Sequence, residues 1–332
     1  MPDSSTKPIA LITGASGFVG RYLARHLLEV SDWTLALVSR NEAGAVRLAD
    51  EYARYPDRVA ALAADISDAK AVQEALARTC PSYVFHLAAQ TSVKDALDDP
   101  AATLGNNLFS TLNLLEGTRA LAEPPRLLAI GSSEEYGHVR PEDNPVDEHT
   151  ELRPDNPYGV SKVATDMLAL QYVFSYKLPV IRVRAFNHIG PGQSDRFVTA
   201  SFARQVALIE AGKQEPVIKV GNLSSQRDFT DVRDIVRAYY LAITQSQPGE
   251  VYNLCSEQST SIQAVLDTLL NFCTVRVRVE LDQTRLRPSD VPLIVGNAAK
   301  FRQLTGWKPA IGLRQSLADI LDYWRAQVRS EP

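Results

Sequence analysis

The segment from Asn156 to Lys162 reads Asn-Pro-Tyr-Gly-Val-Ser-Lys and contains a phenol and an ammonium at a spacing that suits proton transfer. Asn156 is a preferred helix N-cap and Pro157 suits the first helical position, so a helix is predicted to begin here. In that helix Tyr158 and Lys162 share a face. A nearby ammonium favours phenolate, so we expect Lys162 to lower the pKa of Tyr158 and make it a proton donor or acceptor for an alcohol/ketone pair. An ordinary helix-surface pair is the alternative interpretation, and other motifs must decide.

A glycine-rich turn near the start of the chain provides the second motif. The apolar run from Pro8 to Thr13 predicts a strand buried on both faces, and it leads into glycines spaced G-x-x-G-x-x-G. A helical pattern follows, with Leu23, Leu27 and Val30 on one face. This context suits a dinucleotide, whose pyrophosphate lies against the glycines at the helix N-terminus. The cofactor contacts predicted in this turn are Gly14, Ser16, Gly17, Phe18, Val19 and Gly20.

The end of the second predicted strand, Trp33 to Val38, indicates which dinucleotide is bound. NAD sites commonly carry an acidic residue about 20 positions past the glycines, where it binds the ribose 2′-hydroxyl. This chain has Ser39 and Arg40 there. A guanidinium suits a 2′-phosphate through charge and bidentate hydrogen bonds, so the pattern favours NADP(H), with NAD(H) as the alternative. The alternative is that Arg40 is only a solvated loop residue without a role in binding the cofactor.

Two further strands add candidate cofactor contacts. The strand predicted over Val59 to Ala63 is followed by Asp65 and Ile66, an expected edge of the adenine pocket, although Asp65 also suits a helix cap. The strand predicted over Tyr83 to Leu87 leads into Ala88 and Ala89, whose small side chains would let the backbone approach the cofactor. We therefore include Leu87, Ala88 and Ala89 among the cofactor contacts.

The fifth predicted strand, Leu127 to Gly131, ends beside a serine and two acidic residues. Strand residues two apart point the same way, so Ser132 and Glu134 project together if the extended geometry continues. Ligands bind at the carboxyl ends of parallel strands, which would place Ser132 near the reacting oxygen alongside Tyr158. Asn107, within a helix predicted over Thr103 to Arg119, either bridges backbone groups near this site or has a purely structural role.

The repeated alternation of strands and helices predicts an α/β fold, a doubly wound parallel sheet of Rossmann type. After a sixth strand, Val180 to Ala185, the alternation is lost and isolated arginines, prolines and glycines become more frequent. We therefore expect a dinucleotide-binding domain over residues 1–185. A smaller mixed α/β lobe over residues 186–332 is expected to return some segments to the first domain. Ile262 to Phe272 and Leu313 to Trp324 are predicted amphipathic helices of that lobe.

The bulk composition excludes several classes of protein. The chain has 332 residues, of which 45% are hydrophobic and 22% charged, as in ordinary soluble domains. A net charge of -4 argues against nucleic-acid binding. The three cysteines and five histidines are scattered, so no metal site is expected, and the odd cysteine count without a signal peptide suggests the cytoplasm. No apolar run is long enough to span a bilayer.

The glycine turn, Ser132, Tyr158 and Lys162 occur in an order that resembles the extended short-chain dehydrogenase/reductase family (NAD-dependent epimerase/dehydratase) over nearly the whole chain. Within that family, the chain is most similar to GDP-4-keto-6-deoxy-D-mannose reductases and related to GDP-mannose 4,6-dehydratases. The stretches that carry this similarity are Phe186 to Gln193 with Phe197 to Thr199, Gly221 to Leu223, Gln226 to Phe229, Arg287 to Val291, Gly296 with Asn297, and Thr305 to Pro309.

The resemblance implies NADPH-dependent reduction of the C4 keto group of GDP-4-keto-6-deoxy-D-mannose to GDP-D-rhamnose. Tyr158 would protonate the oxygen, Ser132 would hold it, and Lys162 would also bind the nicotinamide ribose. Implied contacts with the nucleotide-sugar are Ser133, Asn187, Val198, Arg227 and Arg287. The two arginines suit a diphosphate, although each taken singly also suits a surface salt bridge. A homodimer is implied, paired through the helices near Thr103 to Arg119 and Ser161 to Val173.

Two other functions stay open at this point. A 4,6-dehydratase also needs a group that removes the C5 proton and helps expel the C6 hydroxyl, and Glu134 occupies the place of the glutamate in related dehydratases. In a reductase the same residue would bind sugar hydroxyls. A non-catalytic dinucleotide sensor on this fold is the third possibility. The intact set of Ser132, Tyr158 and Lys162 argues against it. UDP or CDP sugars, and other epimerase or dehydratase reactions, remain alternatives.

Overall fold

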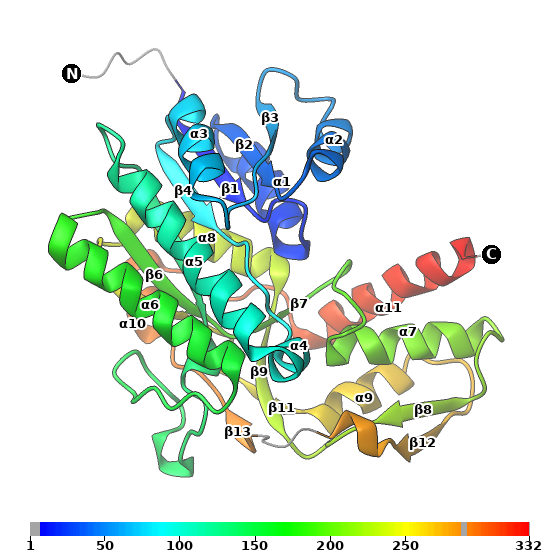
Figure 1. Cartoon of the computed structure of the whole chain (residues 1–332). Helices are drawn as coiled ribbons and strands as arrows, with labels where there is room; N and C mark the ends of the chain where they lie inside the picture. The colour runs from blue at the N-terminus through cyan, green and yellow to red at the C-terminus, as the bar shows by residue number, and fades with distance from the viewer. Residues whose placement is uncertain (1–6, 287–290, 332) are drawn as a thin grey trace.

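The computed structural model describes residues 7–286 and 291–331, and its centre is a parallel sheet of seven strands. The strand order is β10-β6-β5-β4-β1-β2-β3 (Figure 1). The chain runs outward from β1 in one direction and returns to β4 on the other side, so the sheet has a switch point between β1 and β4. Ligands bind at such points in doubly wound sheets, and the predicted fold class is confirmed. The strands are β1 Ile9–Thr13, β2 Thr34–Ser39, β3 Val59–Ala63, β4 Tyr83–His86, β5 Arg126–Ser132, β6 Val180–Ala185 and β10 Val251–Leu254.

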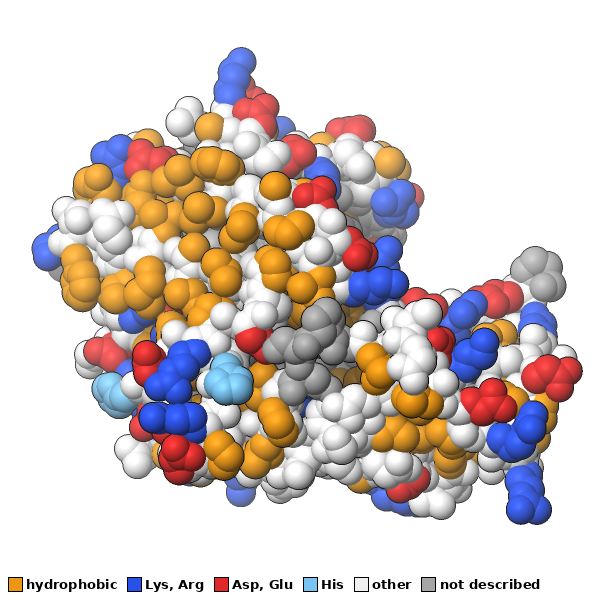
Figure 2. Space-filling model, turned by 60° about the horizontal axis from the view of Figure 1, so that its bottom comes forward, with side chains coloured by type: hydrophobic (Ala, Val, Ile, Leu, Met, Phe, Trp, Pro, Cys, Tyr) orange, Lys and Arg blue, Asp and Glu red, His pale blue; other side chains and the backbone are white. Residues whose placement is uncertain are grey.

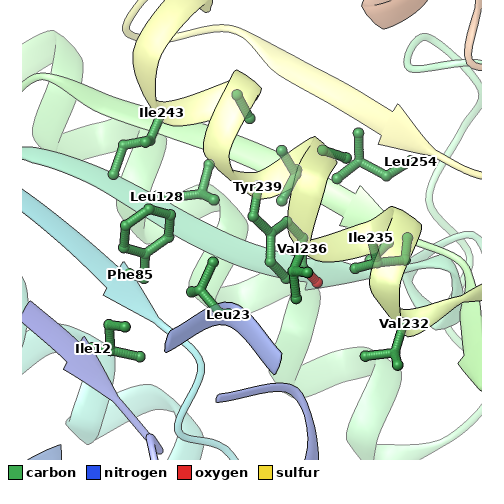
Figure 3. Packing of buried hydrophobic residues seen from close by; sticks show 14 of the residues in the cluster. Ile12, Leu23, Phe85, Leu128, Val232, Ile235, Val236, Tyr239, Ile243 and Leu254 are labelled. Carbon is green, nitrogen blue, oxygen red and sulfur yellow. The ribbon is translucent and has the colours of Figure 1, made fainter. Parts of the chain in front are cut away.

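Helices cover both faces of this sheet because successive strand residues point to opposite sides and both sets are apolar. On one face Ile12, Phe85 and Leu128 pack against α1 and α8, as Figure 3 shows. On the other face Leu11 and Val84 belong to a second cluster that includes residues of α3, α5 and α6. The helices around the sheet are α1 Phe18–Val30, α2 Glu42–Glu51, α3 Ala69–Thr79, α4 Val93–Asp98, α5 Pro100–Arg119, α6 Pro157–Tyr176 and α8 Val232–Gln245.

The second half of the chain forms a smaller lobe with its own hydrophobic core. Helices α7, α9 and α11 lie together beside the short strands β8 and β12 (Figure 1). However, α8 and β10 belong to the large sheet's layers, so the two lobes exchange chain segments. The division at residue 185 stays a prediction. The lobe contains β7 Asn187–Ile189, α7 Val198–Glu210, β8 Val217–Val220, β9 Gln226–Asp231, β11 Ser259–Ser261, α9 Ile262–Leu270, β12 Arg278–Leu281, β13 Leu293–Ile294 and α11 Leu313–Ser330. Helix α10, Ala299–Thr305, packs instead on β10 and α8 beside the large sheet.

The predicted elements all form, with shifts at their ends. Leu23 and Leu27 are buried as expected, but Val30 is 46% exposed because it is the last residue of α1. Helix α9 ends before Phe272, whereas α11 continues past Trp324 to Ser330. Across residues 7–286 and 291–331, none of the helices combines the length and the apolar character needed to cross a bilayer.

Candidate active site

The start of α6 has the predicted geometry. The side chain of Asn156 accepts a hydrogen bond from the Gly159 backbone N–H at 2.9 Å, and Pro157 is the first helical residue. This cap directs the first turn of the helix into the molecule, where Tyr158 is 8% exposed and Lys162 is 7% exposed. The Tyr-x-x-x-Lys pair is therefore buried, which contradicts the interpretation as an ordinary surface pair.

A polar contact below the first turn fixes its position. The Asn107 side chain on α5 bonds both the N–H and the C=O of Gln90, at 2.8 and 3.0 Å, and donates to Ser161 Oγ at 2.9 Å. Ser161 in turn donates to the carbonyl oxygen of Tyr158 at 2.7 Å. Asn107 thus bridges backbone near the site, as one of the two interpretations held. Ser161 was missed, since a helical serine in the sequence carries no signal of such a contact.

The side chains of Ser132 and Tyr158 lie close enough together for the Ser132 hydroxyl to affect the pKa of the phenol. Burial raises the pKa of Tyr158, the nearby Glu134 and Glu135 add to the rise, and the Ser132 hydrogen bond opposes it. The predicted lowering of this pKa by Lys162 is wrong for this structure. The Lys162 ammonium lies 6.0 Å from the centre of the Tyr158 ring. It donates instead to the carbonyl oxygen of Ile130 at 2.8 Å.

The surroundings of Lys162 are apolar enough to affect its own charge. Burial lowers the pKa of Lys162 to about 8, while the negative Glu135 opposes this effect. Burial together with the Lys162 charge lowers the pKa of His86 to about 3, so this imidazole stays neutral. Its two ring nitrogens lie 3.0 Å from the Thr13 hydroxyl and 3.1 Å from the Thr111 hydroxyl. Thr13, His86 and Thr111 therefore form an uncharged hydrogen-bonded chain that connects β1 to α5.

The glycine turn has the geometry that a pyrophosphate requires. Gly14 has a φ of +68°, and a Cβ there would lie 2.9 Å from the backbone nitrogen of Ala88. A Cβ on Gly20 would lie 2.5 Å from the Gly14 carbonyl oxygen. Gly17 is the N-cap of α1, with no side-chain cap and no acidic residue in the first turn. The first N–H groups of α1 are thus suited to an anion, and the residues present fit a bound dinucleotide.

A cleft of about 1720 Å³ connects the glycine turn, the buried Tyr158 and the smaller lobe. Most of the predicted site residues line it. Those that do are Gly14, Gly17, Phe18, Val19, Gly20, Leu87, Ala89, Ser132, Ser133, Glu134, Tyr158, Lys162, Asn187, Val198 and Arg227. Those that do not are Ser16, Ser39, Arg40, Asp65, Ile66 and Ala88. Arg287 lies outside the described residues.

The predicted residues at the ends of β2 and β3 form a separate group. Ser39 is packed under α2, since a Cβ on Gly44 would lie 1.9 Å from its hydroxyl. Arg40 is exposed and donates to Asn106 Oδ1 at 3.4 Å. The pKa of Asp65 is lowered, chiefly by the Ser67 N–H and in part by Arg40, so Arg40 and Asp65 are neighbours. The N-cap of α3 is Asp68, so the alternative role of Asp65 as that cap is wrong.

The segment after β5 differs from the expected extension of the strand. The strand ends at Ser132, and Ser133–Glu135 form a 3₁₀ turn, η1, closed by a capping box. Glu134 still lines the cleft, and its Oε2 accepts from Asn156 Nδ2 at 2.8 Å. Glu135 points inward and is fully buried, which the sequence analysis did not anticipate. The sequence feature that could have indicated this residue is the second carboxylate next to Glu134. Its direction depends on the chain forming a 3₁₀ turn here instead of continuing as a strand.

The predicted substrate residues of the smaller lobe that the structure describes also line the cleft. Arg227 Nη1 donates to the carbonyl oxygens of Gln226 and Val291, at 2.9 and 2.6 Å. Asn187 Nδ2 lies 3.5 Å from the carbonyl oxygen of Asp228. These contacts hold both side chains at the cleft wall. Whether Arg227 contacts a diphosphate stays a prediction.

The sheet, the glycine turn, the half-buried Ser132 and the buried Tyr158 and Lys162 together define an enzyme of the extended short-chain dehydrogenase/reductase class. The GDP-mannose 4,6 dehydratase family model matches residues 11–320. The chain belongs to this family.

Individual relatives include both a reductase and dehydratases. A GDP-6-deoxy-D-mannose reductase from Pseudomonas aeruginosa is 37% identical over 96% of this chain and 98% of its own length. GDP-mannose 4,6 dehydratase 1 from Arabidopsis thaliana is 30% identical over 95% and 89%. A solved structure of RMD from Pseudomonas aeruginosa complexed with NADPH superposes with a TM-score of 0.84 at 34% identity, covering 97% of this chain and 100% of that one.

Proposed function

We propose that the protein reduces the C4 keto group of GDP-4-keto-6-deoxy-D-mannose with NADPH and yields GDP-D-rhamnose. The observation that carries this proposal is that Ser132, Tyr158 and Lys162 line the same cleft as the glycine turn. The 37% identity to a GDP-6-deoxy-D-mannose reductase supports the choice of substrate. The cofactor, when bound, supplies the hydride; the protein orients and polarises the ketone.

Tyr158 donates the proton in this mechanism. Its raised pKa keeps the phenol protonated until the ketone oxygen gains negative charge and takes the proton. Ser132 donates a hydrogen bond to the same oxygen, which stabilises the developing alkoxide. Lys162 lines the same cleft, and its ammonium would hold the nicotinamide ribose of the bound dinucleotide.

The dehydratase is the second candidate function, favoured by the position of Glu134 in the cleft. The two activities are separated by substrate. Purified protein given GDP-mannose and catalytic NADP+ is expected to form no 4-keto product. The same protein should oxidise NADPH stoichiometrically when GDP-4-keto-6-deoxy-D-mannose is supplied, with GDP-D-rhamnose identified by NMR. Formation of the ketosugar from GDP-mannose would establish the dehydratase instead.

We propose NADP(H) as the preferred cofactor because Arg40 occupies the place where an acidic residue would bind an NAD ribose. The NADPH complex of RMD supports this preference, although a UDP-glucose 4-epimerase from Thermus thermophilus that superposes at a TM-score of 0.83 and 26% identity, over 96% of this chain and 99% of that one, is complexed with NAD. Arg40 is exposed at the edge of the sheet, where a 2′-phosphate can reach it.

Replacing Arg40 with alanine is expected to lower kcat/KM for NADPH about tenfold or more, the range of a hydrogen bond to a charged group. The value for NADH should change little because no 2′-phosphate is involved. Steady-state kinetics with both cofactors measure the ratio. Arg47→Ala, an exposed arginine of α2, is the matched control. A parallel loss for both cofactors would contradict the assignment.

We propose that the protein is a homodimer that pairs through α5 and α6. Val160, Met167 and Phe174 are spaced seven residues apart, so they form one stripe along α6, and all three are exposed. Phe109 on the adjacent α5 is also exposed, and Figure 2 shows hydrophobic side chains gathered on this side of the molecule. In a homodimer, this stripe would be buried against the same stripe of the second copy. The cytoplasmic location stays a prediction.

A double change of Met167 and Phe174 to glutamate is expected to convert the dimer to a monomer, because burying these carboxylates would be too costly. Light scattering after size exclusion measures the mass. Leu281→Glu, an exposed apolar position on β12, is the control and should leave the dimer intact. A wild-type protein that is monomeric at micromolar concentration would refute the proposal.

A further inference from the structure

Glu135 is a fully buried carboxylate directly behind the proposed catalytic serine. Its Oε1 accepts from the backbone N–H of Ser132 at 2.8 Å, and its Oε2 accepts from Arg184 Nε at 3.0 Å. Gly131 leaves the room for it, since a Cβ there would lie 2.2 Å from Glu135 Oε1. Both oxygens thus accept from N–H donors, one of them cationic, as an ionised carboxylate does. Glu135 therefore anchors the start of the η1 turn to the end of β5.

The ion pair continues away from the cleft and holds Glu135 in place. Arg184 Nη2 donates to Asp166 Oδ2 at 2.8 Å, and Arg182 Nη1 donates to Asp166 Oδ1 at 2.9 Å. Buried charges cost free energy unless they are paired, and this network pairs two carboxylates of η1 and α6 with two guanidiniums of β6. Glu135 itself does not line the cleft. Any effect it has on the reaction must therefore act through neighbouring groups.

Two of those neighbours are proposed catalytic residues. Its negative charge raises the pKa of Lys162 against the effect of burial, and Lys162 in turn lowers the pKa of Glu135. The charge also adds to the raised pKa of Tyr158. Burial and Asp166 raise the pKa of Glu135 to about 8, although Arg184 and the Ser132 N–H oppose that rise.

The groups that face Lys162 come from each packed element. They are the neutral His86 on β4, the Ile130 carbonyl on β5, Glu135 on η1 and Tyr158 on its own helix. The arginines of β6 are neutralised by Asp166 and Glu135. Glu135 is therefore the acidic side chain that acts on the ammonium.

We propose that Glu135 is a positioning residue for the reaction: its buried side chain, held by Arg184, fixes the main chain of Ser132 and through it the Ser132 hydroxyl. The inference rests on the proposed reductase activity. It assigns the task to an acceptor oxygen that reaches the Ser132 N–H, so the length of the side chain is decisive.

Two conservative variants test this task. Glu135→Gln keeps an acceptor for the Ser132 N–H at the same reach, so kcat should stay within about threefold of the wild type. Glu135→Asp withdraws the carboxylate by one methylene from Ser132. Its kcat should fall about tenfold as the serine loses its alignment. KM for the ketosugar should change little in both.

Asp166→Asn is the matched control. It weakens the same buried network by one charge and lowers thermal stability, yet it has no bond to Ser132. Its kcat should stay near that of Glu135→Gln despite the lower melting temperature. The proposal is overturned if Glu135→Asp keeps the wild-type kcat, or if Asp166→Asn lowers kcat as much as Glu135→Asp does. Failure of the wild type to oxidise NADPH with the ketosugar would instead refute the proposed function.

Discussion

Replacing Tyr158 with phenylalanine is expected to lower kcat for ketosugar reduction about a thousandfold, within the range that a positioned general acid contributes. The phenol is the proposed proton donor beside Ser132, and phenylalanine removes its proton without changing the ring. Affinity for the dinucleotide should persist, because the glycine turn and the N-terminus of α1 are unchanged. Single-turnover oxidation of NADPH measures the chemical step, and fluorescence titration measures cofactor binding.

Tyr172→Phe is the matched control for this change. Tyr172 lies on the same helix, but its hydroxyl donates to Glu116 of α5. Tyr172→Phe also removes a phenolic oxygen from α6, but Tyr172 does not line the cleft. Its kcat should therefore stay near the wild-type value. If Tyr158→Phe left the turnover of every candidate nucleotide-sugar unchanged, the non-catalytic sensor would become the better interpretation.

Replacing Lys162 with methionine is expected to lower kcat about a hundredfold or more, the range for removing one preorganised electrostatic group. Stability should not fall with it. Burial of the ammonium is unfavourable, as the lowering of its pKa to about 8 indicates, and methionine fills similar volume without charge. A protein that melts no earlier than the wild type but turns over far more slowly would show that the charge serves catalysis. Calorimetry and steady-state kinetics together test this.

The wild-type enzyme should also lose activity on the alkaline side. Because the pKa of Lys162 is lowered to about 8, its positive charge is present below that pH and is lost as pH rises through it. The kcat–pH profile should therefore fall above about pH 8. Lys70→Met, at an exposed position on α3, should keep the wild-type profile. A wild-type profile that stays flat to pH 10 would contradict an essential ammonium.

The sequence by itself determined the order of elements and the main functional motifs. Apolar runs bounded by glycine, serine and asparagine predict strands and helix starts because capping and burial act over a few residues. The glycine turn and the helix that begins after Asn156 were found this way. Local rules also placed Tyr158 and Lys162 on one face of α6.

Tertiary structure decided the environment of those residues. The pKa of Tyr158 rises instead of falling because burial depends on how α6 packs on β5, which no local pattern states. Glu135 turns inward because β5 ends at Ser132 and a 3₁₀ turn begins, and its partner Arg184 is far along the chain. Electrostatic interactions act through space, whereas helix caps and strand patterns act along the chain. Which residues form the site was therefore largely predictable from the sequence, but the charge states of their side chains were not.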